Sequence, residues 1–387
     1  MVSVGDRSLF PGLEARAYLG HCAISPWSTP VVEALERAAA DWARRGVDAF
    51  LAQKADRDAL RLELARLVGA DSDEIALVPN VTSAAIGVAN CFDWRPGDRL
   101  LLFRGEFPTN VTPWQAAARH FDLEVVWLDT SLFLDSPEAG LAAFEAALKK
   151  HLRLAAVSLV EFQTGLRMPV EEMARLAHQY GCRLFVDGIQ AAGAMPIDCQ
   201  GWGLDFLAVG SHKWLMGPDG AGFLRVARQA WGELVPRLAG WLSHTDALDF
   251  LFLGEGHLRY DRPLRQDPAF FESGSLNSLG YAGLRASVGL LLELGTGSIF
   301  EHIQAYLDPL EEGLIELGFS SLRRRHGRSG ILALRPPTGL VAGELVAGLK
   351  THGVIASHPD GLLRLGPHWP NGLAEVEAVL AAVRSCL

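Results

Sequence analysis

The chain alternates between short apolar runs and amphipathic stretches over its first 226 residues. The apolar runs are four to seven residues long with at most one charged residue each, which is typical of strands buried on both faces. The pattern therefore predicts strands at seven places, namely residues 75–78, 99–103, 123–128, 154–160, 183–186, 206–209 and 222–226.

Most of these runs are separated by stretches whose apolar residues recur every three or four positions, which predicts helices. Two helices are expected before the first strand and four between the strands, at residues 29–45, 57–67, 83–91, 111–120, 139–150 and 170–180. Strands that alternate with helices form a mainly parallel sheet covered by helices on both faces. The sequence therefore predicts an α/β fold.

The pattern changes between residues 240 and 268, where aromatic and charged residues are frequent and periodicity is weak. We place a domain boundary there, with an N-terminal segment at 1–20, a large domain at 21–255 and a small C-terminal domain at 256–387. The small domain is expected to be α+β, because helical patterns mix with short strand candidates, at 279–294, 299–317 and 373–383 for helices and at 330–334, 354–356 and 362–365 for strands.

Composition narrows the class of protein. The 387 residues carry a net charge of −10 without a basic block, which argues against nucleic acid as a partner. The apolar stretches are too short to cross a bilayer, and the first residues lack the pattern of a signal peptide. Five scattered cysteines without C-x-x-C spacing predict neither a metal site nor a disulfide framework. A cytoplasmic enzyme without membrane partners fits these features.

Two polar residues follow predicted strands. Asp187 ends the run at 183–186, and Lys213 comes shortly after the run at 206–209. A carboxylate can hold the nitrogen of an aromatic heterocycle, and a lysine with a lowered pKa can bond to an aldehyde across the same pocket. Pyridoxal phosphate requires both groups. A strand cap and a surface lysine would give the same spacing, so the neighbouring motifs have to decide.

Those motifs resemble the signature of fold-type I, class V pyridoxal phosphate enzymes. The resemblance rests on Ser211-His212-Lys213-Trp214 and on the glycine-rich stretch at 217–222, and it extends from about Tyr18 to the C-terminus. The family includes class V aminotransferases, cysteine desulfurases, selenocysteine lyases, isopenicillin N epimerases and kynureninases. The resemblance implies pyridoxal 5′-phosphate as cofactor and a mainly parallel seven-stranded sheet in which the strand at 222–226 runs antiparallel.

The resemblance also implies where the cofactor phosphate binds. A turn at residues 80–83 follows the first strand and opens a helix, where amide donors and the helix dipole suit a phosphate. An ordinary helix N-cap would use the same residue types. In the family this turn binds the phosphate, and the lysine motif adds further contacts. The expected phosphate contacts are Val81, Thr82, Ser83, Ser211 and His212.

Relatives place an aromatic residue on the cofactor ring, and Phe107 occupies that position here. Cysteine desulfurases and selenocysteine lyases usually have histidine there, whereas kynureninases have a Phe-Pro-Thr stretch like residues 107–109. A phenyl ring stacks but carries no proton, which counts against desulfurase chemistry. Gln190 is expected to donate to the cofactor phenolic oxygen, and Phe162 stands where many relatives have an asparagine for the same contact.

Two further residues extend the resemblance to substrate and subunit contacts. Arg364 lies in a stretch, 363–371, that is similar to the family's carboxylate-binding segment, and a guanidinium fork suits a carboxylate. A surface arginine at a strand end is the alternative. Ser275, in the stretch 271–275, resembles a residue that contacts the phosphate of the neighbouring subunit. The resemblance therefore implies a homodimer with shared active sites.

Cysteine desulfurases carry a catalytic cysteine shortly before the carboxylate-binding arginine. Residues 349–364 contain no cysteine, so a persulfide-forming desulfurase is not expected. Cys22 lies in the N-terminal segment that often reaches the active site, and we interpret it as a small buried residue.

The leading interpretation is a class V aminotransferase that acts on an α-amino acid through a Lys213 aldimine and a quinonoid intermediate. Lys213 is expected to move the Cα proton, and Asp187 to hold the proton on the pyridine nitrogen. A lyase of the kynureninase or carbon–sulfur type and an epimerase use the same residues and stay open as alternatives. A nicotinamide oxidoreductase would need a G-x-G-x-x-G after the first strand, which is missing. A non-catalytic regulatory protein would not need Lys213, Asp187 and Arg364 together.

Overall fold

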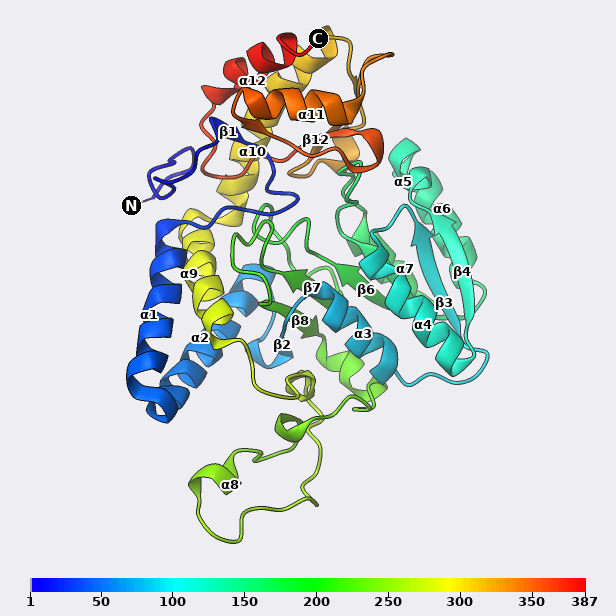
Figure 1. Ribbon diagram of the computed structural model, residues 1–387. Coiled ribbons are helices and arrows are strands. Elements are labelled where there is room, and N and C mark those ends of the chain that lie inside the picture. The colour runs from blue at the N-terminus through cyan, green and yellow to red at the C-terminus, as the bar shows by residue number, and fades with distance from the viewer. Residues whose placement is uncertain (1) are drawn as a thin grey trace.

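The computed structural model describes residues 2–387. Seven strands form its central sheet in the order β2-β8-β7-β6-β5-β3-β4 (Figure 1). Neighbouring strands run parallel, except that β8 is antiparallel to both β2 and β7. The prediction of a mainly parallel sheet with an antiparallel strand at 222–226 is confirmed. The strands are β2 (Ile75–Val78), β3 (Arg99–Arg104), β4 (Glu124–Asp129), β5 (Leu152–Ser158), β6 (Arg183–Asp187), β7 (Phe206–Gly210) and β8 (Gly222–Val226).

Helices cover both faces of this sheet, because successive residues of a strand point to opposite sides. In β3, Leu100 and Leu102 belong to the apolar cluster that includes α3 (Val81–Cys91) and α4 (Thr112–Phe121). Leu101 and Phe103 belong to the cluster on the other face. The helices of that second face are α2 (Phe50–Val68), α6 (Pro137–Leu148) and α7 (Val170–Gln179). Burial on both faces explains why the strands are apolar throughout.

Two N-terminal helices pack against a helix from the second half of the chain. The helix α1 (Thr29–Arg45) and α2 both pack against α9 (Ser278–Leu294) (Figure 1). The apolar face of α1 buries Val31, Ala34 and Ala38 against its neighbours. The spacing of these three residues, three and four apart, is the helical period that the sequence predicts.

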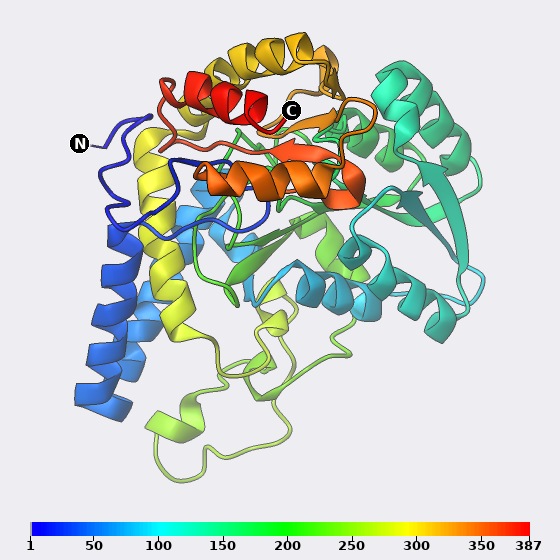
Figure 2. The same ribbon diagram turned by 45° about the horizontal axis from the view of Figure 1, so that its top comes forward.

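The C-terminal part forms a second layer beside the carboxyl ends of the strands (Figures 1 and 2). Its antiparallel sheet has the order β12-β10-β9, and the N-terminal strand β1 pairs in parallel with β11. The N-terminal segment therefore packs on the C-terminal part of the chain. The elements are β1 (Ala17–Tyr18), β9 (Ser320–Ser321), β10 (Leu332–Arg335), β11 (Val354–Ile355), β12 (Leu363–Leu365), α10 (Thr296–Glu316), α11 (Ala342–Thr351) and α12 (Glu375–Arg384).

Three helices were not expected from the sequence, and one of them is the four-residue helix α8 (Asp249–Phe252). The helix α5 (Ser131–Asp135) has only five residues, too few to show a helical period. The helix α11 contains Gly343 and Gly348, and glycine weakens a helical signal. Packing of Leu345 and Leu349 into the core stabilises α11 in spite of these glycines.

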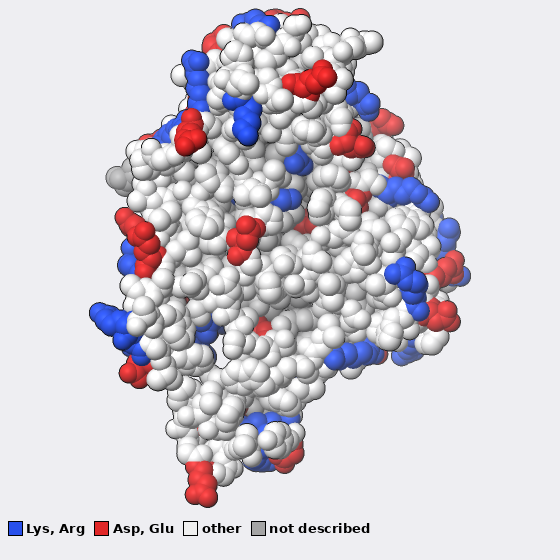
Figure 3. Space-filling view, in the orientation of Figure 1, with Lys and Arg blue, Asp and Glu red and all other residues white. Residues whose placement is uncertain are grey.

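Residues 240–268 form an excursion that projects from the body of the molecule and contains the four-residue helix α8 (Asp249–Phe252) (Figure 1). Several of its apolar side chains are exposed, including Leu253, Leu258 and Tyr260. The domain boundary proposed in this region stays a prediction. On the face shown in Figure 3, charged side chains lie mostly near the outline, and the middle of the face is largely uncharged. Within residues 2–387 there is no helix long and apolar enough to cross a membrane.

Candidate active site

A cavity of about 620 Å³ opens at the carboxyl ends of β5, β6 and β7, between the central sheet and the C-terminal layer. Ligands of parallel α/β sheets bind at this edge, because the loops that follow the strands meet there. Eight of the residues expected from the sequence line this cavity: Val81, Thr82, Phe107, Asp187, Gln190, His212, Lys213 and Arg364. Ser83, Ser211 and Ser275 are not part of its wall.

Asp187 and Lys213 follow adjacent strands and share the cavity. Asp187 is buried at the end of β6, and its Oδ1 accepts a hydrogen bond of 2.9 Å from the Ile189 amide. Burial raises the pKa of the Asp187 carboxyl to about 6, although the Ile189 amide and the charge of Lys213 oppose the rise. Burial also lowers the pKa of Lys213, and Arg364 lowers it further while Asp187 raises it. The site therefore favours an uncharged amine, as covalent chemistry at a lysine requires.

Phe107 covers the amine. The Lys213 Nζ lies 5.6 Å from the centre of the Phe107 ring, which is 45% exposed. Phe107 in turn meets Phe162 edge to face, with 5.3 Å between ring centres. A flat molecule next to Lys213 would have an aromatic wall on this side.

The N-terminus of α3 forms another end of the cavity. Asn80 caps this helix, and its side-chain oxygen accepts a hydrogen bond of 2.8 Å from the Ser83 amide. The Thr82 hydroxyl lies 2.8 Å from the Thr109 hydroxyl. The first amides of a helix have no partner within the helix, so Val81 and Thr82 can offer donors to an anion.

Two expected phosphate contacts point elsewhere. The Ser83 amide is occupied by the N-cap residue Asn80. Ser211 is fully buried, and its hydroxyl donates to the Pro218 carbonyl. His212 does line the cavity, and its Nδ1 lies 3.4 Å from the Asp219 carboxylate. Burial and the charge of Lys213 lower the pKa of His212. The roles of Ser83 and Ser211 stay predictions, and neither hydroxyl faces the cavity.

The amide group of Gln190 is held from both sides. Its Nε2 donates to the Cys22 carbonyl at 3.0 Å, and its Oε1 accepts from the indole N–H of Trp214 at 2.8 Å. Trp214 is fully buried, and its own carbonyl lies 2.8 Å from His368 Nε2. The tryptophan that follows Lys213 in sequence therefore determines which way the Gln190 amide points.

Arg364 comes from β12 in the C-terminal layer and is 6% exposed. Its Nε donates to the Ser357 hydroxyl at 3.0 Å, and its Nη1 donates to the Phe162 carbonyl at 2.6 Å. Both acceptors are uncharged, so they orient the guanidinium without neutralising it. An anion in the cavity would meet a fixed positive charge.

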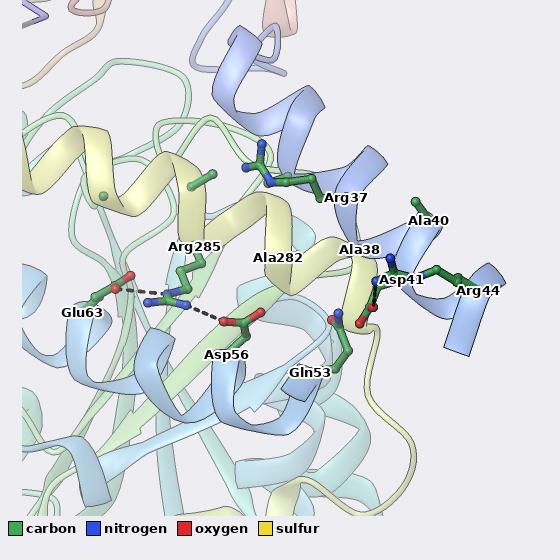
Figure 4. A pocket seen from close by; sticks show the side chains of 13 residues that line it. Arg37, Ala38, Ala40, Asp41, Arg44, Gln53, Asp56, Glu63, Ala282 and Arg285 are labelled. Atoms are coloured by element: carbon green, nitrogen blue, oxygen red, sulfur yellow. Dashed lines mark hydrogen bonds and ion pairs between the residues drawn. The ribbon is translucent and has the colours of Figure 1, made fainter. Parts of the chain in front are cut away.

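Other cavities lie away from this chemistry. Ser275 lines a cavity of about 570 Å³ near α2 and the excursion, so its expected contact requires a second subunit and stays a prediction. A larger cavity of about 750 Å³ lies between α1, α2 and α9 (Figure 4). There Arg285 is bound by Asp56 at 2.6 Å and Glu63 at 3.1 Å, so its charge is already balanced. Among residues 2–387, no group of three or more His, Cys, Asp or Glu residues is arranged to hold a metal ion.

Sequence reasoning missed Glu106, which precedes Phe107. Its carboxyl group accepts a hydrogen bond of 2.5 Å from the Ser158 amide and also bonds to the Ser158 hydroxyl. Ser158 is the neighbour of Asp187 across the sheet. Burial raises the pKa of Glu106 to about 8 against the hydrogen bonds from Ser158, and Asp187 and Glu161 add to the rise. A lone glutamate in a loop gives no sequence signal for such a position.

Comparison with known proteins decides the family. The sequence model of the family "Aminotransferase class-V" matches residues 18–357. The chain belongs to this aminotransferase class-V family. Its relatives include the uncharacterized aminotransferase YcbU of Bacillus subtilis (strain 168), which is 27% identical over 371 residues, or 96% of this chain and 94% of the relative. A probable cysteine desulfurase of Methanothermobacter thermautotrophicus is 31% identical over 297 residues, or 76% of this chain and 70% of the relative.

Solved structures agree with this membership of the class V family. The apo cysteine desulfurase of Thermococcus onnurineus NA1 superimposes with a TM-score of 0.83 at 25% identity, covering 95% of this chain and 94% of that chain. A variant of C-DES with glycine covalently linked to its pyridoxal phosphate cofactor gives a TM-score of 0.87 at 24% identity, covering 98% of both chains. The fold is that of fold-type I pyridoxal phosphate enzymes, and this class V protein is a pyridoxal phosphate-dependent enzyme.

The cavity fits pyridoxal phosphate on three observations. Asp187 is a buried carboxylate whose raised pKa shows that it lacks a sufficient cationic partner, and a protonated pyridine nitrogen would supply one. Phe107 offers a ring for stacking beside the Lys213 amine. The N-terminus of α3 offers amide donors for a phosphate at the other end. These residue types are the ones that the class V cofactor needs.

Proposed function

We propose that this class V enzyme is an aminotransferase that acts on an α-amino acid. The observation that carries the proposal is that Arg364 and Lys213 line one cavity. An α-amino acid has a carboxylate and an amine on one carbon, and these groups match a guanidinium and a reactive lysine site. Similarity to YcbU, which is described as an aminotransferase, supports the same function.

Each residue has a defined task in this proposal. Bound pyridoxal phosphate supplies an electron-withdrawing ring that stabilises negative charge at the substrate Cα. Lys213, whose pKa is lowered by burial, would take the proton from the substrate Cα and hold it at its Nζ. Asp187 holds the proton on the ring nitrogen, and Phe107 stacks on the ring and excludes water.

The remaining residues bind and orient. Val81, Thr82 and His212 bind the phosphate, with amides of the α3 N-terminus as the main donors. Gln190 donates to the phenolic oxygen with the N–H that is not used by Cys22. Arg364 binds the substrate carboxylate and so determines where Cα lies relative to Lys213.

A carbon–sulfur lyase is the second candidate. It is favoured by the similarity to a probable cysteine desulfurase and by Cys22, a fully buried residue of the cavity wall. Cys91, Cys182 and Cys199 are buried outside the cavity wall, so Cys22 would have to serve any persulfide chemistry at this site. Such chemistry would use the same Lys213 and Asp187.

One experiment separates the two functions. Purified enzyme saturated with pyridoxal phosphate is mixed with single amino acids while the absorbance spectrum is recorded. An aminotransferase leaves the cofactor in its amino form, releases a 2-oxo acid and regains the first spectrum when another 2-oxo acid is added. A lyase releases ammonia or sulfide and keeps turning over with one substrate. Lys213→Ala is the control and should bind cofactor without turnover; full activity in this variant would refute the proposal.

We further propose that the enzyme is a homodimer in which Ser275 contacts the neighbouring subunit's cofactor phosphate. The exposed apolar residues of the excursion, such as Leu253 and Leu258, support an interaction surface, since such patches are uncommon on monomers. Light scattering should give twice the chain mass, and Leu253→Glu with Leu258→Glu should weaken association. Val47→Glu, at an exposed apolar residue of the short 3-10 helix that follows α1 (Gly46–Ala49), is the control. A monomer at high protein concentration would contradict the proposal.

A further inference from the structure

Part of the cavity wall is built from uncharged residues. Three segments far apart in the sequence supply it: residues 22–24, Phe162 and Pro359. Phe162 joins them to the rest of the site, because its carbonyl accepts from Arg364 at 2.6 Å and its ring lies edge-on against Phe107 at 5.3 Å. A substrate whose carboxylate is bound by Arg364 would therefore have this wall within reach of its side chain.

Each charged group of the cavity already has a partner in the proposed function. Asp187, Lys213 and Arg364 serve the ring nitrogen, the reacting amine and the substrate carboxylate in the proposed function. The wall has three other titratable residues: the Cys22 thiol is fully buried, and His212 and Asp219 lie 3.4 Å from each other beside Lys213. The wall therefore has no free charge for a substrate side chain.

Two carboxylates near the wall, those of Asp360 and Glu161, do not line the cavity. Asp360 follows Pro359, and its carboxylate accepts a hydrogen bond of 3.4 Å from Gln163. Glu161 is buried and is not part of the cavity wall. Its Oε2 accepts hydrogen bonds from the amides of Gln163 and Thr164, its Oε1 has no hydrogen-bond partner, and burial raises its pKa although the charge of Arg364 opposes the rise. A charged substrate side chain would lose water against Phe162, Ile24 and Pro359 without gaining an ionic partner, which is unfavourable.

We infer that the enzyme selects α-amino acids with uncharged, apolar side chains, and that Phe162 is the residue that determines this selectivity. The inference rests on the proposed binding of the substrate carboxylate by Arg364. Phe162 can orient Arg364 and select the substrate at the same time. Its backbone carbonyl accepts the hydrogen bond from Arg364, while its ring would contact the side chain of the bound amino acid.

Matched pairs of amino acids test the inference. Norleucine and lysine differ by a terminal amine, and methionine and glutamate have similar length but differ in charge. The readout is the concentration at which each amino acid half-saturates the absorbance change of the cofactor-loaded enzyme. We expect norleucine and methionine to bind about tenfold or more tightly than their charged counterparts. Equal half-saturation within both pairs would overturn the inference while leaving the proposed function intact.

Two variants assign the selectivity to Phe162. Phe162→Asn should reduce the difference within each pair, whereas Phe162→Leu, the matched apolar control, should keep it. Both variants retain the backbone carbonyl that orients Arg364, so binding of the substrate carboxylate should be preserved in both. An unchanged preference in Phe162→Asn, with a normal cofactor spectrum, would show that Phe162 does not select the side chain. If no amino acid alters the spectrum of the wild-type enzyme, the proposed function fails and this inference fails with it.

Discussion

The two ends of the cavity are built in different ways. At the cofactor end, Asp187 and Lys213 follow adjacent strands of a seven-stranded sheet whose main chain is hydrogen-bonded throughout the ladder. At the substrate end, Arg364 lies on a three-residue strand, and its guanidinium donates to Ser357 and to Phe162, which lie outside the helices and strands. The central sheet thus places the groups proposed for the cofactor, whereas a short strand and its surrounding loops place the groups proposed for the substrate.

The electrostatic state of the two ends also differs. Asp187 is buried with a raised pKa, and in the proposed function the cofactor ring would supply the cation that it lacks. Arg364 is buried with uncharged acceptors on its guanidinium, and in the proposed function the substrate carboxylate would supply the anion. The cofactor end would therefore be completed once, on cofactor binding, whereas the substrate end would be completed in every turnover.

Removing the substrate-end charge should have the largest effect. Arg364→Ala should weaken amino acid binding by about 2–5 kcal/mol, because the carboxylate would be desolvated without a partner. The cofactor spectrum should stay unchanged, since Arg364 does not belong to the cofactor end. Spectral titration with an amino acid, and with a simple amine that has no carboxylate, measures this. Equal losses for amine and amino acid would mean that Arg364 has only a structural role.

Removing the cofactor-end charge should affect turnover. Asp187→Asn should retain the cofactor but lose about 1.5–3 kcal/mol of transition-state stabilisation, or roughly ten- to 150-fold in rate, because an amide cannot hold the ring proton. Amino acid binding at Arg364 should change little. Single-turnover rates at saturating substrate measure the effect, and a rate close to that of the wild type would place the essential carboxylate elsewhere.

A change at Trp214 tests whether the cofactor end depends on the hydrogen bond from the Trp214 indole to Gln190. Trp214→Phe removes the donor to Gln190 Oε1, so the amide loses its fixed direction and the cofactor absorbance band should shift. The loss of one uncharged hydrogen bond should cost about 0.5–1.5 kcal/mol, or a few-fold to about tenfold in rate.

A matched control separates positioning from stability. Trp94 is also buried, and its indole donates to the Ala89 carbonyl at 2.8 Å in the layer beneath the sheet, far from the cavity wall. Trp94→Phe should lower the melting temperature similarly and leave the absorbance band in place. A band shift in both variants would assign the effect of Trp214 to general destabilisation.

The smallest effect on turnover at neutral pH is expected for Glu106→Gln, beneath the cofactor end. The pKa of Glu106 is raised from 4.5 to about 8, chiefly by burial, so the carboxyl is neutral at pH 7 and glutamine imitates it. A raised pKa in the folded state means that the folded protein binds the proton more tightly. The free energy of unfolding therefore falls as pH rises from 4.5 to 8, and the fall is complete above the folded pKa.

Melting temperatures between about pH 5 and about pH 9 measure this contribution. Glu106→Gln should lose less stability with rising pH than the wild type, because glutamine does not ionise. Glu33→Gln, which changes an exposed carboxylate paired with Arg37, is the control and should follow the wild-type curve. Identical curves for all three proteins would show that Glu106 is ionised in the folded state at neutral pH.

The sequence by itself indicated a mainly parallel sheet and the order of strands and helices along the chain, and its resemblance to a known family indicated the residues proposed for the cofactor end. Asp187 and Lys213 could be found because each follows a buried strand within a few residues, and the apolar period marks where such strands end. The helix that begins at Val81 could be predicted for the same reason, because a helix cap and the apolar period depend on only about ten neighbouring residues.

Only the tertiary structure decided how the substrate end is assembled and which polar groups remain available. The contact from Arg364 to Phe162 joins residues 202 positions apart, and that from Gln190 to Cys22 joins residues 168 positions apart. Ser211 illustrates the other limit, because its hydroxyl turns inward to Pro218 although its place in the motif suggests a phosphate contact. Local patterns encode backbone conformation and burial, whereas side-chain direction and the pKa of a group such as Glu106 depend on distant segments that pack around it.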